Sequence, residues 1–302
     1  MAPTGTIRIG TRGSTLALWQ ARWVAERLGV ELPGYKLEVV TVTTRGDVTA
    51  GPLTGATGEI GFFTSEIEAA LLEGRVDLAV HSLKDLPTAE DGPPVVAIPL
   101  RGDPCDVLVS RTRQALADLP EGARVGTSSP RRSCLVRSRR PDLEVVPIRG
   151  NVDSRVRKVR EGAFDAVVLA AAGLDRLGLG DEVSERFDPR LLPPAPGQGA
   201  LAVQARADAG PLLDALLRID EPLARGTATA ERVCLAALGG GCSRPIGAHA
   251  WLEQGRLSLI AFVGSEDGSK TVRAEASGES AEELGRSVAA DLLRRGAREL
   301  LA

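Results

Sequence analysis

Two adjacent side chains of opposite charge, Lys84 and Asp85, follow an apolar segment over 76–80 that the sequence predicts to be a buried strand. In α/β sheets, ligands bind beyond the carboxyl ends of the strands, where both residues are expected. A lysine there can bind a carboxylate, and an aspartate there can transfer a proton or stabilise a developing cation. The alternative is an exposed ion pair that contributes little, and these residues alone leave the two interpretations level.

Arginines gather at two expected helix starts. Arg131 and Arg132 follow Pro130, a residue typical of the first helical position, and Arg155 lies one turn beyond the expected N-cap Asn151. Helix starts already carry free N–H groups and a partial positive charge, so cations there call for an offsetting anion. Guanidinium groups bind carboxylates through two parallel hydrogen bonds. The pattern therefore favours a carboxylate or phosphate site over a solvated basic helix face.

The thiol of Cys242 is a further candidate for chemistry. It follows three glycines at 239–241, which end an expected helix and leave the backbone free to turn, and Arg244 stands two residues beyond it. A nearby guanidinium favours the thiolate, which is the nucleophilic form. Cys134 and Cys234 fall inside expected helices, where cysteine acts as a small apolar residue. Cys242 is thus the cysteine expected to be functional.

Composition limits the class of protein. The chain has 302 residues, 43% apolar and 25% charged, as in globular proteins of more than one domain. Four cysteines without a CxxC motif, and only two histidines, argue against a zinc site or a disulfide framework, so we expect no metal. We also expect no membrane span, because no run of about 18 apolar residues occurs. The first residues lack the apolar segment of a secretory signal, which predicts a cytoplasmic protein.

Charge is unevenly distributed along the chain. The net charge is −3, which argues against a general affinity for nucleic acid. Residues 124–160 nevertheless carry an excess of eight positive charges. Because this stretch contains both arginine-bearing helix starts, the local excess is consistent with an anionic ligand.

Two short patterns of the first half recur in the second. Gly10-Thr11 and Gly126-Thr127 each end an expected strand and lie 116 residues apart. The segment 73–80 resembles the segment 161–168 at an offset of 88, and each leads from a helix through glycine into a strand. The patterns favour a duplicated α/β lobe with mostly parallel strands, although chance similarity of such short strings is the alternative.

The last part of the chain differs in kind. Expected strands over 246–252, 257–263 and 271–276 are joined by short turns and followed by a helix over 281–300. These elements predict a small α+β domain after the two lobes.

Seven motifs, in this order and spacing, make the chain similar to the porphobilinogen deaminase (hydroxymethylbilane synthase) family over nearly its whole length. They are IRIGTRGSTLALWQA, HSLKDLPT, GTSSPRR, IRGNVDSR, LAAAGLDRLG, PGQGALAVQ and GGGCSRPIGAHA. The resemblance implies an α/β fold of two lobes like those of type II periplasmic binding proteins around a cleft, plus a small α+β C-terminal domain. The domains it implies are residues 1–99 with 200–219, residues 100–199, and residues 220–302.

The resemblance also implies a reaction. Members carry a dipyrromethane cofactor in thioether linkage to the loop cysteine, here Cys242. On this primer they join four porphobilinogen molecules head to tail with loss of ammonia, and release hydroxymethylbilane for tetrapyrrole synthesis. The implied partners are porphobilinogen and the growing polypyrrole chain, and a monomer is expected.

Residue roles follow from the same motifs. The resemblance makes Asp85 the catalytic residue, which would bind pyrrole N–H groups and stabilise the cation left when ammonia departs. The residues implied in cofactor binding are Cys242, Lys84, Thr127, Ser129, Arg131, Arg132, Arg149 and Asp47. The residues implied in substrate binding are Arg12, Ser14, Gln20, Arg155, Arg176 and Gln198.

One stretch departs from the family pattern. Over 58–66 many members carry lysines where this chain has Ile60 and Ser65, so the loop is expected to contribute less to carboxylate binding. A capping box starting at Ser65 is still expected to begin the following helix.

Other classes of function are possible from the residues. A non-catalytic cytoplasmic anion-binding protein of the same two-lobe fold would need the arginines but neither Cys242 nor Asp85. A transcription regulator would need a helix-turn-helix, and a thiol redox enzyme a second cysteine close to the first. Cofactor-dependent transfer remains the leading interpretation.

Overall fold

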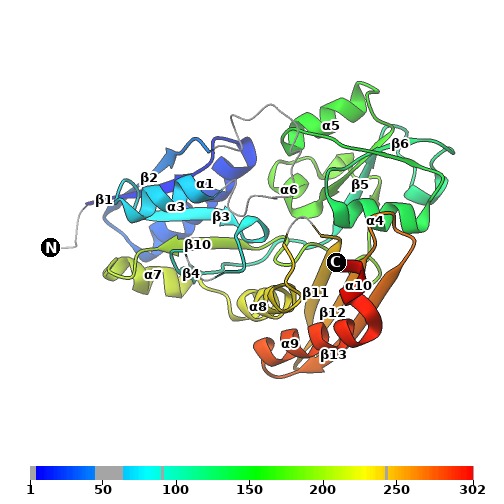
Figure 1. Cartoon of the computed structure of the whole chain (residues 1–302). Coiled ribbons are helices and arrows are strands. Elements are labelled where there is room, and N and C mark those ends of the chain that lie inside the picture. The colour runs from blue at the N-terminus through cyan, green and yellow to red at the C-terminus, as the bar shows by residue number, and fades with distance from the viewer. Residues whose placement is uncertain (1–4, 45–63, 90–91, 242–243, 302) are drawn as a thin grey trace. The chain divides into compact units, whose positions relative to one another are not determined.

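The computed structural model describes residues 5–44, 64–89, 92–241 and 244–301. The chain divides into two compact units, which we call unit 1 (Met1–Arg101 and Ala200–Arg225) and unit 2 (Gly102–Gly199 and Gly226–Ala302). Figure 1 follows their elements from the blue N-terminal strands to the red C-terminal helices. The expected division into three domains stays a prediction.

Unit 1 is built on a five-stranded sheet of order β2-β1-β3-β10-β4. Its strands are β1 (Gly5–Thr11), β2 (Tyr35–Thr41), β3 (Leu78–Ser82), β4 (Val95–Ala97) and β10 (Leu201–Ala205). Helices α1 (Thr15–Glu31) and α7 (Pro211–Ile219) pack on one face, and α3 (Ser65–Leu72) packs on the other (Figure 1). The sheet is therefore buried on both faces, which accounts for its apolar strands.

Unit 2 contains a second five-stranded sheet, of order β7-β6-β8-β5-β9. Its strands are β5 (Asp106–Ser110), β6 (Arg124–Gly126), β7 (Glu144–Val146), β8 (Ala166–Ala170) and β9 (Glu185–Arg186). Helix α4 (Pro130–Arg139) covers one face, while α5 (Val152–Arg160) and α6 (Ala171–Arg176) cover the other. Two 3₁₀ turns complete this part, η2 (Leu116–Asp118) and η3 (Gly180–Glu182).

The duplicated plan is confirmed in the strand register. Ile9 pairs with Leu78 in unit 1, and the residues at offsets of 116 and 88, Val125 and Ala166, pair in unit 2. The likeness extends to side chains. The N–H of Arg8 donates to Asp77 Oδ2 at 2.8 Å, and the N–H of Arg124 donates to Asp165 Oδ2 at 2.9 Å. These positions are related by the same two offsets, so the two sheets share one framework.

The expectation of mostly parallel sheets holds for strand direction, but one strand of each five-stranded sheet is reversed. β1 is parallel to β2 and β3, and β6 is parallel to β7 and β8, as expected. However, β10 runs antiparallel to β3 and β4, and β5 runs antiparallel to β8 and β9. Local patterns cannot predict this, because each of these strands joins its sheet by long-range pairing.

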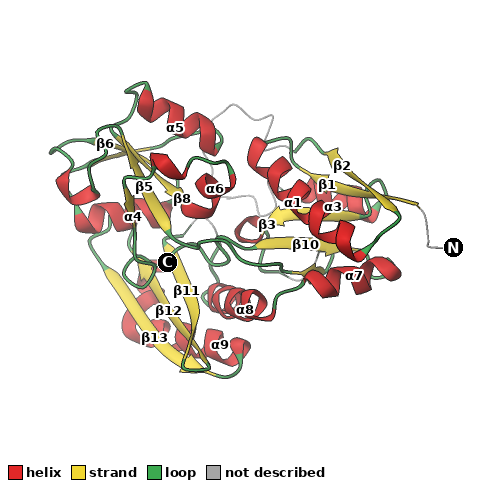
Figure 2. Ribbon diagram, turned by 180° about the vertical axis from the view of Figure 1, so that it is seen from behind, coloured by secondary structure: helices red, strands yellow, loops and turns green. Residues whose placement is uncertain are grey.

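The remaining part of unit 2 is a three-stranded antiparallel sheet of order β11-β12-β13. Its strands β11 (Ile246–Glu253), β12 (Arg256–Gly264) and β13 (Thr271–Gly278) match the expected ones within two residues. Helices α8 (Pro222–Ala237) and α9 (Ala281–Leu292) pack on this sheet (Figure 2). The fold class, two α/β lobes plus a small α+β part, is confirmed.

Two helix boundaries differ from expectation. The single helix expected over 281–300 is interrupted by a π turn over Leu293–Ala297, where Gly296 has φ 99°, before α10 (Arg298–Leu301). The N-cap of α3 is Thr64 rather than Ser65, and no side chain caps it, so the expected capping box does not form. Within the described ranges, no helix is long and apolar enough to cross a membrane.

Glu231 is a buried carboxylate that joins three parts of unit 2, and we predict that it is needed for stability. It is 0% exposed on α8, and its oxygens accept the N–H groups of Gly197 at 2.7 Å and Ala250 at 2.8 Å. In Glu231→Gln the amide N–H₂ would face one of these donors. The free energy of unfolding should fall by about 2 kcal/mol. Urea denaturation followed by tryptophan fluorescence measures it. The exposed matched change Glu283→Gln should cost little, and equal stability of both variants would contradict the assignment.

His81 should make unit 1 less stable in mild acid. Burial lowers the pKa of His81 to about 4, with a smaller contribution from Arg12 that also lowers it. Between about pH 6.5 and pH 4 the unfolded chain therefore binds a proton that the folded chain does not. Stability should be fully present above this window and fall by about 3 kcal/mol on acidification through it. In His81→Gln the fall in unfolding free energy, measured by urea denaturation at each pH, should be smaller. Identical pH profiles would refute the prediction.

Candidate functional site

In unit 1, Arg12 and Ser14 lie in the connection between β1 and α1. Ser14 is the N-cap of α1, and its Oγ accepts the N–H of Ala17 at 3.2 Å, as expected for a serine in this position. Gly10 is required at the end of β1, since a Cβ there would lie 2.9 Å from Val76 Cγ2. Arg12 is partly buried just before the cap. The connection thus places the guanidinium group of Arg12 close to the N-terminus of α1.

Lys84 and Asp85 lie in the 3₁₀ turn η1 (Leu83–Asp85) directly after β3. Leu83 and Leu86, which such a turn places on one side, are 1% and 6% exposed and anchor it. Lys84 is partly buried and Asp85 is exposed. Because β1 and β3 are parallel neighbours, this turn and Arg12 belong to the same edge of the sheet.

Gln20, a predicted substrate ligand, faces the interior of unit 1. It is 3% exposed, and its Nε2 donates to Ser82 Oγ at 3.0 Å. Ser82 is the last residue of β3, so Gln20 holds α1 to the strand that leads into the turn of Lys84 and Asp85. In this position Gln20 supports the site, and its contact with a substrate stays a prediction.

In unit 2, the connection between β6 and α4 carries Thr127 and Ser129. Ser129 is the N-cap of α4, and its Oγ accepts the N–H of Arg132 at 3.4 Å. Thr127 is buried, and its Oγ1 accepts the N–H of Ser129 at 3.2 Å. Ser128 Oγ donates to the carbonyl of Ile148 at 2.8 Å and thereby joins this loop to the one that leads to α5. The two arginine-bearing connections are therefore tied together.

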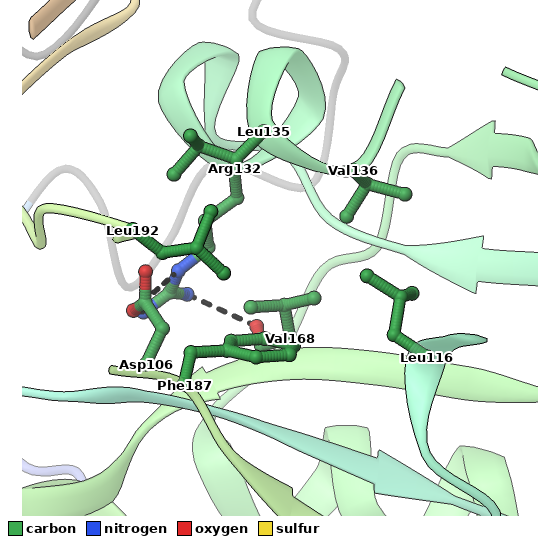
Figure 3. A pocket seen from close by; sticks show the side chains of 8 residues that line it. All are labelled: Asp106, Leu116, Arg132, Leu135, Val136, Val168, Phe187 and Leu192. Carbon is green, nitrogen blue, oxygen red and sulfur yellow. Dashed lines mark hydrogen bonds and ion pairs between the residues drawn. The ribbon is translucent and has the colours of Figure 1, made fainter. Parts of the chain in front are cut away.

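Arg131 and Arg132 are not on a solvated face but share one buried carboxylate. They are 4% and 8% exposed, and Asp106 is 2% exposed. Arg131 Nη1 lies 2.6 Å from Asp106 Oδ2, and Arg132 Nη2 lies 2.7 Å from Asp106 Oδ1. Arg132 also donates from Nε to Oδ1 at 3.0 Å and from Nη1 to the carbonyl of Val168 at 3.0 Å (Figure 3).

The electrostatics of this cluster are set by burial and by the pairing of charges. Burial alone would raise the pKa of Asp106, but Arg131 and Arg132 outweigh it and hold that pKa below its ordinary value. Burial lowers the pKa of Arg131, although Asp106 opposes the shift. Two guanidinium groups against one carboxylate leave one positive charge in excess, and a buried charge without a partner is costly.

Gln198, another predicted substrate ligand, belongs to the same cluster. It is 1% exposed, and its Nε2 donates to Asp106 Oδ1 at 3.0 Å and to the carbonyl of Pro104 at 2.7 Å. Its Oε1 accepts from Arg132 Nη2 at 3.4 Å. Gln198 thus closes a network around the carboxylate, and its contact with a substrate stays a prediction.

Arg155 lies close enough to this cluster to affect it. Its Nε donates to the carbonyl of Gly150 at 2.7 Å. Burial, and then the positive charge of Arg132, lower the pKa of Arg155. Within the described residues, Asp106 is the one carboxylate that forms an ion pair with any of Arg131, Arg132 and Arg155. This part of unit 2 is suited to bind anions.

Arg149 and Arg176 stand in other surroundings of unit 2. Arg149 is exposed in the loop before α5, and its carbonyl accepts Lys158 Nζ at 2.9 Å. Arg176, at the end of α6, donates from Nη2 to the carbonyl of Gly199 at 2.7 Å. Burial lowers the pKa of Arg176 to about 10, with Asp175 opposing the shift. No contact given for the described residues joins either side chain to Asp106.

A small cavity lies beside the Arg132–Asp106 pair. Figure 3 shows its other walls, which are apolar: Leu116, Leu135, Val136, Val168, Phe187 and Leu192. Apart from the ion pair, these walls offer nothing to a charged ligand. The cavity places one side of the pair against a medium of low dielectric constant, which strengthens the attraction between the two groups.

Two predicted site residues, Cys242 and Asp47, lie outside the described residues, as does Ile60. The other three cysteines are unsuited to act as nucleophiles. Burial raises the pKa of Cys105 and Cys234 to about 12 and that of Cys134 to about 11. Within the described parts of the chain, no group of His, Cys, Asp and Glu could hold a metal ion.

The functional residue that sequence reasoning missed is Asp106. Two cations at the start of α4 are electrostatically unfavourable, and this predicts a nearby anion. In the structure that anion is the carboxylate of Asp106. The available signal was an acidic residue directly before the apolar strand residues 107–109. A charged residue at the start of a buried strand needs a partner, and the nearby arginines were the candidates.

Two family models match the chain. The family model described as "Porphobilinogen deaminase, dipyromethane cofactor binding domain" matches residues 7–214, and the model for the C-terminal domain of porphobilinogen deaminase matches residues 226–294. Among solved structures, the chain is similar to a probable amino-acid ABC transporter extracellular-binding protein from Bacillus subtilis. That match has a TM-score of 0.43 at 15% identity, over 72% of this chain and 90% of the other.

Relatives of similar length give the same result. A porphobilinogen deaminase of Roseiflexus castenholzii is 48% identical over 98% of this chain and 99% of its own length. One from Deinococcus radiodurans is 46% identical over 98% of both chains. One from Mycolicibacterium paratuberculosis is 48% identical over 98% of this chain and 96% of its own. With two family models covering both units and relatives that align from end to end, the chain belongs to the porphobilinogen deaminase family.

Proposed function

We propose that this chain joins porphobilinogen molecules head to tail, with loss of ammonia, and releases hydroxymethylbilane for tetrapyrrole synthesis. The observation that carries the proposal is the excess of buried positive charge in unit 2 of a chain of this family. Each pyrrole of the substrate and product bears an acetate and a propionate. Buried guanidinium groups are the side chains best suited to hold several such carboxylates in fixed orientations.

The described residues fit a dipyrromethane cofactor. Arg131, Arg132 and Arg155 are opposed by one carboxylate, so an anion of more than one negative charge would neutralise the group. The two pyrroles of the cofactor carry carboxylates of this kind. Thr127 and Ser129 add hydroxyl groups at the start of α4. When bound, the cofactor supplies the pyrrole carbon from which the product chain grows.

Cys242 is the residue that we propose for cofactor attachment. The raised pKa values of Cys105, Cys134 and Cys234 leave little thiolate at neutral pH, so these residues are poor nucleophiles. Cys242 follows a glycine run and is followed by Arg244, which favours a thiolate. The proposal includes a cytoplasmic enzyme, because Cys242 must meet the cofactor as a thiol and thiols persist in a reducing compartment. It also includes a monomer.

Asp85 is proposed as the catalytic group. Its turn is held by Leu83 and Leu86, so the exposed carboxylate is presented from a rigid strand end. A carboxylate fixed there can accept pyrrole N–H groups and stabilise the cation that forms when porphobilinogen loses ammonia. Lys84 beside it would bind a carboxylate of the cofactor. Arg12 and Ser14, at the same sheet edge, would bind substrate carboxylates.

The mass of the intact protein tests the proposed cofactor and its attachment. Purified wild type should carry an increment of one dipyrromethane, because Cys242 would form a thioether that survives denaturation. Cys242→Ala should lack the increment, and Cys105→Ala should retain it as a matched control. A wild-type mass that stays unmodified after incubation with porphobilinogen would leave a non-catalytic anion-binding protein as the better interpretation.

Replacement of the proposed catalytic carboxylate should stop turnover without unfolding the protein. Asp85→Asn keeps the shape of the side chain but removes its charge, and the loss of charge stabilisation should slow porphobilinogen consumption by roughly 100-fold or more. The rate is measured per mole of cofactor-bearing protein. Asp208→Asn makes the same change at a side chain that is 81% exposed in unit 1 and should be active. Wild-type rates in Asp85→Asn would remove Asp85 from the mechanism.

A further inference from the structure

The two arginines on Asp106 do not use their hydrogen-bond donors alike. Arg132 engages all three nitrogens inside unit 2, with Asp106, the carbonyl of Val168 and Gln198 as acceptors. Arg131 engages only Nη1, which donates to Asp106 Oδ2 at 2.6 Å and to the carbonyl of Pro193 at 3.1 Å. Among the described residues, neither Nε nor Nη2 of Arg131 has an acceptor within hydrogen-bond distance, although the side chain is only 4% exposed.

The remaining donors of Arg131 form a defined binding edge. Nε and Nη2 lie on one side of the planar guanidinium group, and their N–H bonds are parallel, so together they match the two oxygens of a carboxylate. Neither nitrogen is among the buried polar atoms that lack a hydrogen-bond partner, so this edge reaches solvent in the free protein. It is therefore accessible to an anionic ligand.

We propose that Asp106 is a positioning residue for the cofactor: by holding Arg131 through Nη1, it turns the Nε–Nη2 edge toward a cofactor carboxylate. The inference rests on the proposed function. Arg132 and Gln198 are the supports of Asp106 in this arrangement, because both bind its Oδ1. Arg131 presents the binding edge.

Asp106 is itself held in place by the sheet. It is the first residue of β5, it pairs with Ala170 of β8, and its carbonyl accepts the N–H of Phe187 at 3.0 Å. Its short side chain has little freedom between two guanidinium groups and the Gln198 amide. The residue that fixes the orientation of Arg131 therefore belongs to a rigid strand and not to a loop.

The position of Asp106 also limits charge repulsion. Without it, the guanidinium groups of Arg131 and Arg132 would stand side by side in a buried place before any ligand arrived. A second carboxylate would neutralise the pair completely and leave no attraction for the cofactor. One shared carboxylate holds both guanidinium groups in the interior of unit 2. One positive charge is left unneutralised and can attract an anionic ligand.

Cofactor loading of Asp106 variants tests the proposal. Wild type, Asp106→Asn and Asp106→Glu are purified, and the fraction that carries the dipyrromethane increment is read from the intact mass. The three proteins are also produced in cells that make no porphobilinogen, so that each starts without the increment, and the rate at which the increment forms on addition of porphobilinogen is measured. Asp106→Asn should load at least about tenfold more slowly, because the Arg131 edge is no longer fixed.

Asp106→Glu keeps the charge but moves the carboxylate by one methylene group. It should fold, and it should load more slowly than wild type because the Arg131 edge is displaced. This variant decides the matter if Asp106→Asn does not fold. Loading of a folded Asp106→Glu at the wild-type rate would show that the position of the carboxylate is unimportant and would overturn the proposal.

Two controls separate positioning from stability. Val125→Ala removes apolar contacts from the core of the same sheet and should lower the unfolding midpoint without slowing loading at temperatures where the protein is folded. Asp142→Asn removes an exposed partner of Arg140 and should load normally. If Asp106→Asn and Val125→Ala slow loading equally at equal stability, Asp106 has only a structural role. A wild type that never gains the increment would instead refute the proposed function.

Discussion

The structure of unit 2 depends on one interaction, the buried carboxylate of Asp106 shared by Arg131 and Arg132. The carboxylate lies 2.6 Å from one guanidinium group and 2.7 Å from the other, and Gln198 closes the network. Because Asp106 starts β5 and both arginines start α4, the network joins the sheet to the helix that covers it. Elements that must bury such charges have little freedom to shift, since a misplaced partner would leave a buried charge unpaired. The anion-binding character of the unit is thus a consequence of how its sheet and helix are joined.

The duplicated framework explains why polar residues gather where they do. In each unit the strand beside the central one, β1 or β6, leads through a Gly-Thr pair into a helix capped by serine. The equivalent strands β3 and β8 then end at the same edge of their sheets, with registers related by the same offsets. The chemistry differs although the framework is shared. The connection after β3 carries Lys84 and Asp85, whereas the start of α4 carries the arginines. A duplicated lobe can thus carry different polar residues in its two copies, because only the connections need to change.

Local patterns in the sequence predicted most of the framework. The strands of the C-terminal part, the helix start at Pro130, and the repeat that relates the two sheets all follow from spacing and residue type. What the sequence did not show depends on contacts between distant residues. The antiparallel strands β5 and β10 pair with strands far away in the chain, and Asp106 meets its arginines across 25 and 26 positions. Gln20 and Gln198 matched the family motifs as ligands, but their burial is decided by tertiary packing. The family resemblance located the polar residues, and the structure shows that Gln20 and Gln198 are held by contacts inside their own units.

The buried arginines raise the question of how a protein can bind a polyanion and still be stable without it. A site that must neutralise several carboxylates needs more cations than anions, and an excess of buried cations destabilises the free protein. In unit 2 the cost is reduced by two means: Asp106 neutralises part of the charge, and Gln198 holds Asp106 in place. Part of the cost remains, because burial disfavours the charged forms of Arg155 and Arg176 and so lowers their pKa. The excess that remains is located at the carboxyl edge of the sheet, on side chains whose orientation is set by a helix start and a strand. A rigid, incompletely neutralised cluster binds carboxylates with little loss of side-chain entropy. The same arrangement keeps Arg131 oriented before a ligand arrives, so the energy of binding need not be used to order it.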